Sequence, residues 1–453
     1  MSTVYYAEGG MNTRVQYRTI LVVGAGAAGM SAAIAAGRSA ACSGRSCSIT
    51  LLERNARPGT KIRISGGGKC NVTHRGTPSE LLEKGFFRLN ERRFLRHALY
   101  VFSNSDLLTL LLSQGVETLE RADGKIFPLS GDASSVAVAF EALLRASSVQ
   151  QLFSGRVRRV ERKGKLFYVT TDEASFTADV VILATGGVSY SRTGTTGDGL
   201  AIARSFGHSL KDSSAALSPV YTVKAPPAPL SGLSLRSAGF AAVAEGNRVD
   251  RRGDILFTHR GYSGPAVLSL SRDIAELCSR FGSALLFADL FPEHGVAELE
   301  EHLLRHGRKN GAQMVRKFLQ SCPMAPLHGG FALAAYGTIP TALVPFLMRE
   351  AALEPDVTWS TLAREKRQSL LAVLKGFPLG RVREVPLDQG EVSAGGVALS
   401  EVNPKSMESR IVPGLFLCGE LLDYAGEIGG FNLQAAFSTG WLAGSHALYS
   451  AQE

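Results

Sequence analysis

The chain has 453 residues, a formal net charge of +9 and 49 glycines, and 45% of its residues are hydrophobic. This length accommodates about two or three domains and is typical of a globular protein with many loops. Because no apolar run is long enough to cross a bilayer, the sequence excludes a membrane-spanning helix. The basic residues are dispersed, as on a solvated surface, although the same charge would favour an anionic partner such as nucleic acid.

The N-terminus and the cysteines indicate a cytoplasmic protein. Residues 1–17 are polar and lack the charged-then-apolar order of a signal peptide, so we expect a flexible extension. No cysteine pair has the spacing of zinc ligands, and we expect free thiols and no metal site. The six cysteines are Cys42, Cys47, Cys70, Cys278, Cys322 and Cys418.

An apolar strand, a glycine-rich turn and an alanine-rich helix follow each other between residues 20 and 34. In the turn, Gly24 allows a tight bend, Gly26 lets the backbone approach a pyrophosphate, and Gly29 lets the helix pack on the strand. The helix N-terminus, at Ala27 and Ala28, then offers N–H groups to phosphates. The next strand ends at Glu53, where a carboxylate can accept hydrogen bonds from both ribose hydroxyls. These features predict a dinucleotide site.

The middle of the chain contains two further kinds of structure. Residues 18–211 alternate strands and helices, which predicts a parallel α/β sheet, and the buried strand Val180–Ala184 ends at Thr185 and Gly186. After residue 212, short strands between Pro and Gly turns predict an antiparallel barrel or sandwich. Helical spacing from residue 296 to residue 374 predicts a helical subdomain.

The last stretch returns to the first domain. A buried strand at 414–418 ends at Gly419 and Glu420, and a long helix follows residue 432. We therefore predict an α/β fold with a discontinuous Rossmann-type FAD-binding domain, an inserted antiparallel β-barrel domain and a small helical domain. The predicted bounds are 18–211 and 390–453 for the FAD-binding domain, 212–290 and 375–389 for the barrel, and 291–374 for the helices.

The C-terminal return favours FAD over NAD as the dinucleotide. Two-part flavoproteins place such a strand–Gly-Glu–helix unit beside the first glycine-rich turn. We expect Glu420 and Asp423 to meet the ribityl or pyrophosphate region. The helix that begins near Gly429, Gly430, Phe431 and Asn432 would stabilise negative charge on a reduced flavin.

A second glycine-rich segment runs from Ser65 to Thr73. Its consecutive glycines, Gly66, Gly67 and Gly68, suit a backbone pressed against a ligand. Cys70 and Asn71 would then lie near the flavin. Cys70 is either a redox thiol or a packed thiol in contact with the cofactor, because no second cysteine is close enough in sequence to resolve a disulfide.

Together these motifs resemble the FAD-binding oxidoreductases of the aminoacetone-oxidase/BaiN type, also called YhiN-like flavoproteins. The resemblance implies a discontinuous FAD domain, an inserted barrel and a helical domain. The family usually has Arg where this chain has Lys69, and often Pro where it has Ser191. The matching segments are residues 22–29, 58–61, 65–73, 127–130, 183–187, 193–199, 256–265, 395–397, 407–409, 419–423 and 429–432.

The resemblance implies an enzyme that transfers a hydride between FAD and a small organic substrate. No second Gly-x-Gly-x-x-Gly turn is present, so NAD(P)H would bind only transiently over the flavin. His259 and Tyr262 are candidate proton donors or substrate contacts. Two alternatives stay open, a flavin-dependent RNA-modifying protein and a non-catalytic FAD-binding sensor, and the sequence leaves the oligomeric state open.

The expected cofactor-binding residues come from all of these segments. They are Gly24, Gly26, Ala27, Ala28, Gly29, Glu53, Arg54, Lys61, Gly66, Gly67, Gly68, Cys70, Asn71, Thr185, Gly186, Gly419, Glu420, Asp423, Gly429, Gly430, Phe431 and Asn432.

Overall fold

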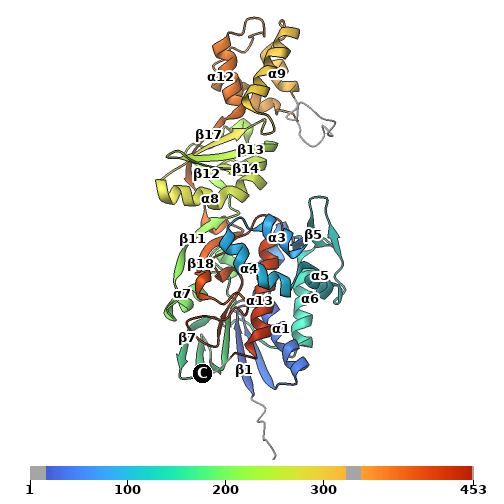
Figure 1. The fold of residues 1–453 in the computed structure, drawn as a ribbon, viewed down its shortest axis with the longest axis vertical. Coiled ribbons are helices and arrows are strands. Elements are labelled where there is room, and N and C mark those ends of the chain that lie inside the picture. The colour runs from blue at the N-terminus through green and yellow to red at the C-terminus, as the bar shows by residue number, and fades with distance from the viewer. Residues whose placement is uncertain (1–16, 323–337, 451–453) are drawn as a thin grey trace, which may run out of the picture.

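The computed structural model describes residues 17–322 and 338–450. The expected N-terminal extension therefore lies outside the described residues, except for Tyr17. Figure 1 shows an elongated molecule in which the parallel sheet and its helices form one end. A β-barrel lies in the middle, and helices α9 (Val296–Lys309) and α12 (Arg364–Lys375) lie at the far end.

A five-stranded parallel sheet forms the core of the first domain. Apart from the edge strand β6, its strands are rich in apolar residues and mostly buried, as expected for a parallel sheet covered by helices. The C-terminal strand β19 pairs in parallel with β10, so the last segment of the chain completes the sheet that the first segment begins. The strand order is β19 (Leu415–Leu417), β10 (Val180–Leu183), β1 (Arg18–Val23), β2 (Cys47–Leu52) and β6 (Gln150–Leu152).

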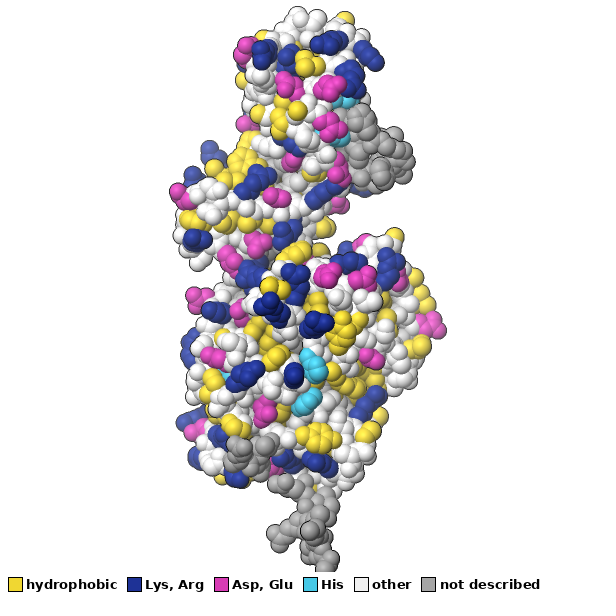
Figure 2. Space-filling model, viewed as in Figure 1, with side chains coloured by type: hydrophobic (Ala, Val, Ile, Leu, Met, Phe, Trp, Pro, Cys, Tyr) yellow, Lys and Arg dark blue, Asp and Glu magenta, His cyan; other side chains and the backbone are white. Residues whose placement is uncertain are grey.

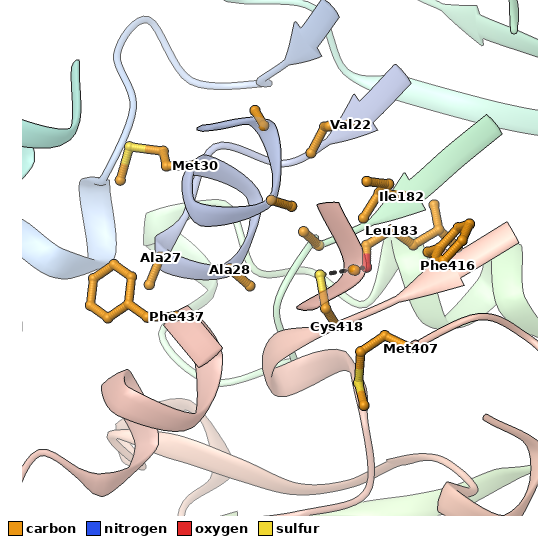
Figure 3. Packing of buried hydrophobic residues seen from close by; sticks show 14 of the residues in the cluster. Val22, Ala27, Ala28, Met30, Ile182, Leu183, Met407, Phe416, Cys418 and Phe437 are labelled. Carbon is orange, nitrogen blue, oxygen red and sulfur yellow. Dashed lines mark hydrogen bonds between the residues drawn. The ribbon is translucent and has the colours of Figure 1, made fainter. Parts of the chain in front are cut away.

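Helices α1 (Ala27–Ser43) and α13 (Phe431–Ala447) pack against each other on this sheet. Their backbones approach closely because a Cβ on Gly440 would lie 2.1 Å from the Ala28 carbonyl oxygen, a separation that no side chain can adopt. Figure 3 shows Ala27 of α1 beside the Phe437 ring of α13. It also shows the Cys418 thiol directed at the Leu183 carbonyl oxygen of the neighbouring strand, 3.8 Å away.

Smaller elements complete the FAD-binding domain. Antiparallel sheets β3-β5-β4 and β7-β8-β9 lie outside the parallel sheet. Their strands are β3 (Thr73–His74), β4 (Thr118–Glu120), β5 (Lys125–Pro128), β7 (Val157–Lys163), β8 (Leu166–Thr171) and β9 (Ser175–Ala178). The helices are α2 (Thr60–Gly68), α3 (Pro78–Gly85), α4 (Leu89–Val101), α5 (Asn104–Leu112), α6 (Ala133–Ala146) and α7 (Asp198–Ser205).

An antiparallel ribbon leads from this domain into a closed barrel. Of the two architectures that the sequence allowed, a barrel or a sandwich, the structure therefore has the barrel. The ribbon consists of β11 (Leu210–Ala216) and β18 (Val392–Val397), and the predicted boundary at residues 211 and 212 falls inside β11. The barrel order is β12 (Val220–Thr222), β15 (Gly261–Ser263), β14 (Asn247–Phe257), β13 (Ser234–Ala244), β16 (Leu285–Asp289) and β17 (Phe377–Glu384). The distal helices include α10 (Val315–Ser321) and α11 (Val344–Glu350).

A buried ion pair joins the barrel to the FAD-binding domain. Arg272 of α8 (Pro265–Phe281) donates to the Glu91 carboxylate of α4 at 2.6 Å, and both residues are at most 8% exposed. Asp423 lies 3.8 Å from the same guanidinium. Removing one member of such a pair leaves a buried charge without a partner, so this contact fixes how the two domains meet.

We expect Gly440→Ala to destabilise the protein by about 2 kcal/mol or more, because the new methyl group forces α1 and α13 apart. Denaturant unfolding followed by circular dichroism measures the effect. Ser445→Ala, on the same helix, is the matched control and should change the free energy of unfolding little. Equal stability of the Gly440 variant and the wild type would show that the two helices do not pack through this glycine.

Candidate flavin site

A cavity of about 750 Å³ opens at the carboxyl ends of the parallel strands, within the size range of small-ligand sites. The glycine-rich turn, α2, the β11–β18 ribbon and the start of α13 enclose it. Among the expected cofactor-binding residues, those that line it are Gly26, Ala27, Ala28, Glu53, Lys61, Gly66, Gly67, Asn71, Thr185, Gly186, Gly419, Glu420, Gly429, Gly430 and Asn432.

Each of the three glycines in the first turn is required for a different structural reason. Gly24 has φ +100°, and a Cβ there would lie 2.6 Å from the Ala184 carbonyl oxygen. A Cβ on Gly29 would lie 1.7 Å from the Gly24 carbonyl oxygen, so this glycine serves packing. Gly26 has an ordinary φ of −80°, and a Cβ there would meet no atom within 4 Å. Only the space in the cavity explains Gly26, and a bound dinucleotide would fill that space.

Two helix N-termini point their free N–H groups at this cavity. Gly26 caps α1 and Gly430 caps α13, and neither helix has a side-chain hydrogen bond at its N-cap. A helix N-terminus without a cap binds anions through its N–H groups and its partial positive charge. The Thr185 hydroxyl on the cavity wall is buried and has no hydrogen-bond partner in the described part of the chain. These donors fit the phosphates and the ring of FAD.

Glu53 lies where the ribose contact is expected. Its carboxylate accepts hydrogen bonds from the N–H groups of Ala25, at 2.7 Å, and Asn55, at 2.8 Å. Burial raises the pKa of this carboxyl above its ordinary value, and the two N–H groups oppose the shift. Each oxygen keeps an acceptor position, so Glu53 can hold the turn and still accept from a hydroxyl.

A smaller cavity of about 50 Å³ continues past Glu53. Arg54, Arg156, Val157 and Asp198 line it. Arg156 forms a two-pronged ion pair with Asp198, with N–O distances of 2.7 and 2.6 Å, and Arg54 donates to Thr196 at 2.7 Å. Sequence reasoning found Arg54 but missed Arg156 and Asp198, although Asp198 stands in one of the matching segments.

Lys61 and Glu420 form one ion pair on the cavity wall. The Lys61 amine lies 2.7 Å from the Glu420 carboxylate and donates to the Ser189 hydroxyl at 2.8 Å. The Ser393 N–H donates to the other Glu420 oxygen at 2.7 Å. The pair therefore connects α2 with β18 and with the end of β19, three segments that are far apart in the sequence.

The second glycine-rich segment begins in the distorted end of α2. Gly66 and Gly67 have φ of +57° and +66°, and a Cβ on Gly67 would meet no atom within 4 Å. With its amide oriented to satisfy both neighbours, Asn71 donates to the Thr73 carbonyl oxygen at 3.0 Å and accepts from the Gly430 N–H at 3.1 Å. Asn71 thereby ties this segment to the start of α13.

Seven expected cofactor residues, Cys70 among them, do not line the large cavity. Gly24 and Gly29 shape the turn, and Arg54 reaches only the smaller cavity. Gly68 lies beyond the lining, and the Phe431 ring stacks on His74 at 4.9 Å. Asp423 faces Arg272 at the domain interface, where burial raises its pKa. The expectation of a direct Asp423–cofactor contact is therefore replaced by a structural role in joining the domains.

Cys70 lies behind the cavity and not on its wall. It is fully buried, has φ +54°, and its N–H donates to the Ser65 carbonyl oxygen at 2.9 Å. Burial raises the pKa of its thiol to about 11. A thiol in this state is protonated at neutral pH and is a poor nucleophile, so the structure favours the packed thiol over the redox thiol.

The structure does not bring His259 and Tyr262 to the cavity. Tyr262 is 3% exposed inside the barrel, and its hydroxyl donates to the Leu379 carbonyl oxygen at 2.9 Å. His259 is exposed in the loop between β14 and β15 and lines neither cavity. Alternation along β15 directs Tyr262 into the barrel, and a short motif cannot reveal that direction without the strand register.

Among the cavity residues that sequence reasoning missed, Tyr190, Glu391 and Glu427 can hold a proton. Tyr190 has φ +49°, an uncommon conformation for a residue other than glycine. The surrounding protein raises the pKa of the Glu391 and Glu427 carboxyls by desolvation. Glu391 precedes the β18 strand directly, and no pattern in the sequence marked it.

The fold and the cavity define a flavoprotein oxidoreductase with a Rossmann-type domain. A family model described as "HI0933-like protein Rossmann domain" matches residues 18–446, and the chain belongs to this family of FAD-dependent oxidoreductases. No helix among the described residues is long and apolar enough to span a bilayer. The described residues also contain no cluster of side chains suited to a metal ion.

Several characterised proteins are similar over nearly their whole length. A 3-dehydro-bile acid delta(4,6)-reductase of Clostridium scindens is 32% identical over 94% of this chain and 98% of its own. A ribosomal RNA dihydrouridine synthase of Escherichia coli is 29% identical over 93% and 96%. Among solved structures, a 3-ketosteroid-delta4-(5alpha)-dehydrogenase of Rhodococcus jostii covers 97% of this chain and 98% of its own, with 17% identity and a TM-score of 0.45.

We expect Gly26→Ala to weaken FAD binding about tenfold or more while leaving the protein folded. The added methyl group meets no protein atom but occupies the cavity. Titration of the apoprotein with FAD, followed by flavin fluorescence, measures the affinity, and the unfolding midpoint is the control. An unchanged affinity would place the phosphates elsewhere.

Alkylation should distinguish the cysteines. At pH 8 only about one in 1,000 Cys70 thiols is ionised at a pKa of about 11, whereas Cys42 is exposed. Brief iodoacetamide treatment of the folded protein followed by mass spectrometry should label Cys42 and leave Cys70 unmodified. Rapid labelling of Cys70 would restore it as a candidate redox thiol.

Proposed function

We propose that this enzyme reduces a carbon–carbon double bond conjugated to a carbonyl group in a small organic substrate. The names of the relatives support this choice. A 3-oxo group conjugates with a delta-4 double bond, and the C5–C6 double bond of uracil conjugates with its C4 carbonyl. Both names therefore describe the reduction of an α,β-unsaturated carbonyl.

The observation that carries the proposal is a proton-holding carboxyl on the wall of the flavin cavity. Glu391 lines the cavity, and Lys61 is the charged group that acts on its carboxyl. The neutral hydroxyl of Tyr190 lies on the same cavity wall. Lys61 is already paired with Glu420, so it only partly opposes the raised pKa of Glu391. A carboxyl with a raised pKa is suited to general acid catalysis near neutral pH.

Held by Glu53 and the N–H groups at the starts of α1 and α13, FAD would supply the hydride, and NAD(P)H, oxidised to NAD(P)⁺, would be the source of its two electrons. The substrate gains this hydride at its β-carbon and a proton at its α-carbon. Glu391 holds that proton and becomes a carboxylate when it donates, after which solvent returns the proton. The N–H groups at the start of α13 stabilise negative charge that develops in the cavity.

The proposed reaction is tested with FAD-loaded protein that has been reduced under anaerobic conditions. Mixing it with a 3-oxo-4-ene steroid or with cyclohex-2-enone should reoxidise the flavin and yield one saturated product per flavin. Reoxidation by oxygen alone, with no product from any conjugated carbonyl compound, would contradict the proposal.

We expect Glu391→Gln to slow this reoxidation by about 100-fold or more, the usual contribution of a general acid. In the wild type the rate should fall as the pH rises through the raised pKa of Glu391, because only the protonated carboxyl donates. The variant should lose this dependence while NAD(P)H reduces its flavin at the wild-type rate. Glu427→Gln is the matched control. If Glu427→Gln slowed flavin reoxidation and Glu391→Gln did not, the proton donor would be Glu427 and not Glu391.

A further inference from the structure

The outward face of helix α4 carries only positive charge. Arg92, Arg93, Arg96 and His97 lie on one helix of 13 residues. Its single acid, Glu91, is 1% exposed and points inward to Arg272. Figure 2 shows Lys and Arg side chains gathered over this part of the molecule, with two histidines below them. We call Arg92, Arg93, Arg96 and the exposed rings beside them the α4 surface.

The arginines of the α4 surface have no acidic partner. Within the described residues, Arg92, Arg93 and Arg96 form no salt bridge, whereas Arg158 pairs with Asp172 at 2.5 Å and Arg159 pairs with Glu161 at 2.7 Å. Arg92 and Arg96 stand four residues apart, a spacing at which like charges repel and weaken a helix. An anionic partner would remove this repulsion.

Aromatic rings are interleaved with these charges. Phe87 is 51% exposed and Tyr100 is 53% exposed, so large rings stand in solvent at both ends of the helix. The Arg96 guanidinium lies over the Tyr100 ring at 5.7 Å, and Arg251 of the barrel lies over Phe87 at 4.3 Å. Exposed rings beside arginines are the usual platform for unpaired nucleobases, because the rings stack on the bases while the charges contact phosphates.

The α4 surface is continuous with other cations and reaches the cavity wall. Burial lowers the pKa of His97, and the positive charges of His446 and Lys405 lower it further. Four residues before α4, at the end of α3, the Gly85 carbonyl oxygen accepts from the Glu427 N–H at 2.8 Å. Glu427 itself lines the flavin cavity, so a strand on this surface would pass close to the site.

We propose that the α4 surface binds a single-stranded segment of RNA, with the arginines on phosphates and Phe87 and Tyr100 on bases. Binding itself is independent of the proposed reaction. The further step, in which a uracil base enters the cavity, rests on the proposed function, because uracil contains the same conjugated carbonyl. An anionic membrane is disfavoured, because charge occupies the centre of the surface and the exposed aliphatic residues Leu89 and Val101 lie only at its two ends.

The test measures binding of a fluorescent 12-nucleotide, uridine-containing RNA to FAD-loaded protein by anisotropy over a series of salt concentrations. The triple variant R92Q/R93Q/R96Q removes the charges and keeps residues that favour helix. The matched control, R158Q/R159Q/R162Q, removes the same charge from strand β7. Flavin content and circular dichroism verify that both variants are folded.

We expect the α4 variant to bind RNA at least tenfold more weakly at moderate salt. The plot of log K against log salt should become less steep by about 2, as for three lost phosphate contacts. The control should stay within about twofold of the wild type. Equal losses in both variants, no binding by the wild type, or tighter binding to vesicles of anionic phospholipid than to RNA would each overturn the proposal. Reduction of cyclohex-2-enone, measured separately, reports on the proposed reaction, so failure of one proposal is distinguishable from failure of the other.

Discussion

The close contact between α1 and α13 is the constraint on which the rest of the site depends. Gly440 lies against Ala28 and Gly444 against Ala32, so the two helices run in the same sense with their backbones touching. Nine residues of α13 precede Gly440, and at a rise of 1.5 Å per residue α13 begins about 12 Å before α1 does. One cavity thus receives two positive helix ends at different depths, an arrangement suited to a long ligand with phosphates and a ring.

Two ion pairs, one buried and one partly buried, connect distant segments of the chain around this helix pair. Lys61–Glu420 joins the second glycine-rich segment to the C-terminal strand, and Glu91–Arg272 joins the first domain to the barrel. Pairs of this kind add little net stability, since desolvation offsets attraction, but breaking one leaves an uncompensated charge. In this fold they fix the relative positions of segments that are 359 and 181 residues apart in the sequence.

The sequence predicted those parts of the site that a local motif determines. Gly24, Gly26 and Gly29 act within a few residues of one another, so their spacing already indicated the strand, the turn and the helix. The return of the C-terminal segment to the first domain could be predicted because Gly419 and Glu420 follow a buried strand, as the first glycine-rich turn does. The fold class and the FAD cofactor followed from these two units.

The rest of the site depends on long-range closure that no local pattern encodes. Tyr262 belongs to the barrel interior because β15 pairs with β12 and β14, and Asp423 turns to Arg272 because α8 packs there. Glu391 and Tyr190 reach the cavity only because the β11–β18 ribbon folds back over it. A single sequence shows such residues as ordinary surface positions.

Hydrogen–deuterium exchange of the apoprotein, with and without FAD, tests whether α1 and α13 converge on the cofactor, since amides that bind it exchange more slowly. We expect strong protection at residues 25–29 and 430–434, with weaker protection at 66–71, and little change in the barrel strands. Protection of only one helix N-terminus, or protection centred on the barrel, would contradict a site built by the convergence of α1 and α13.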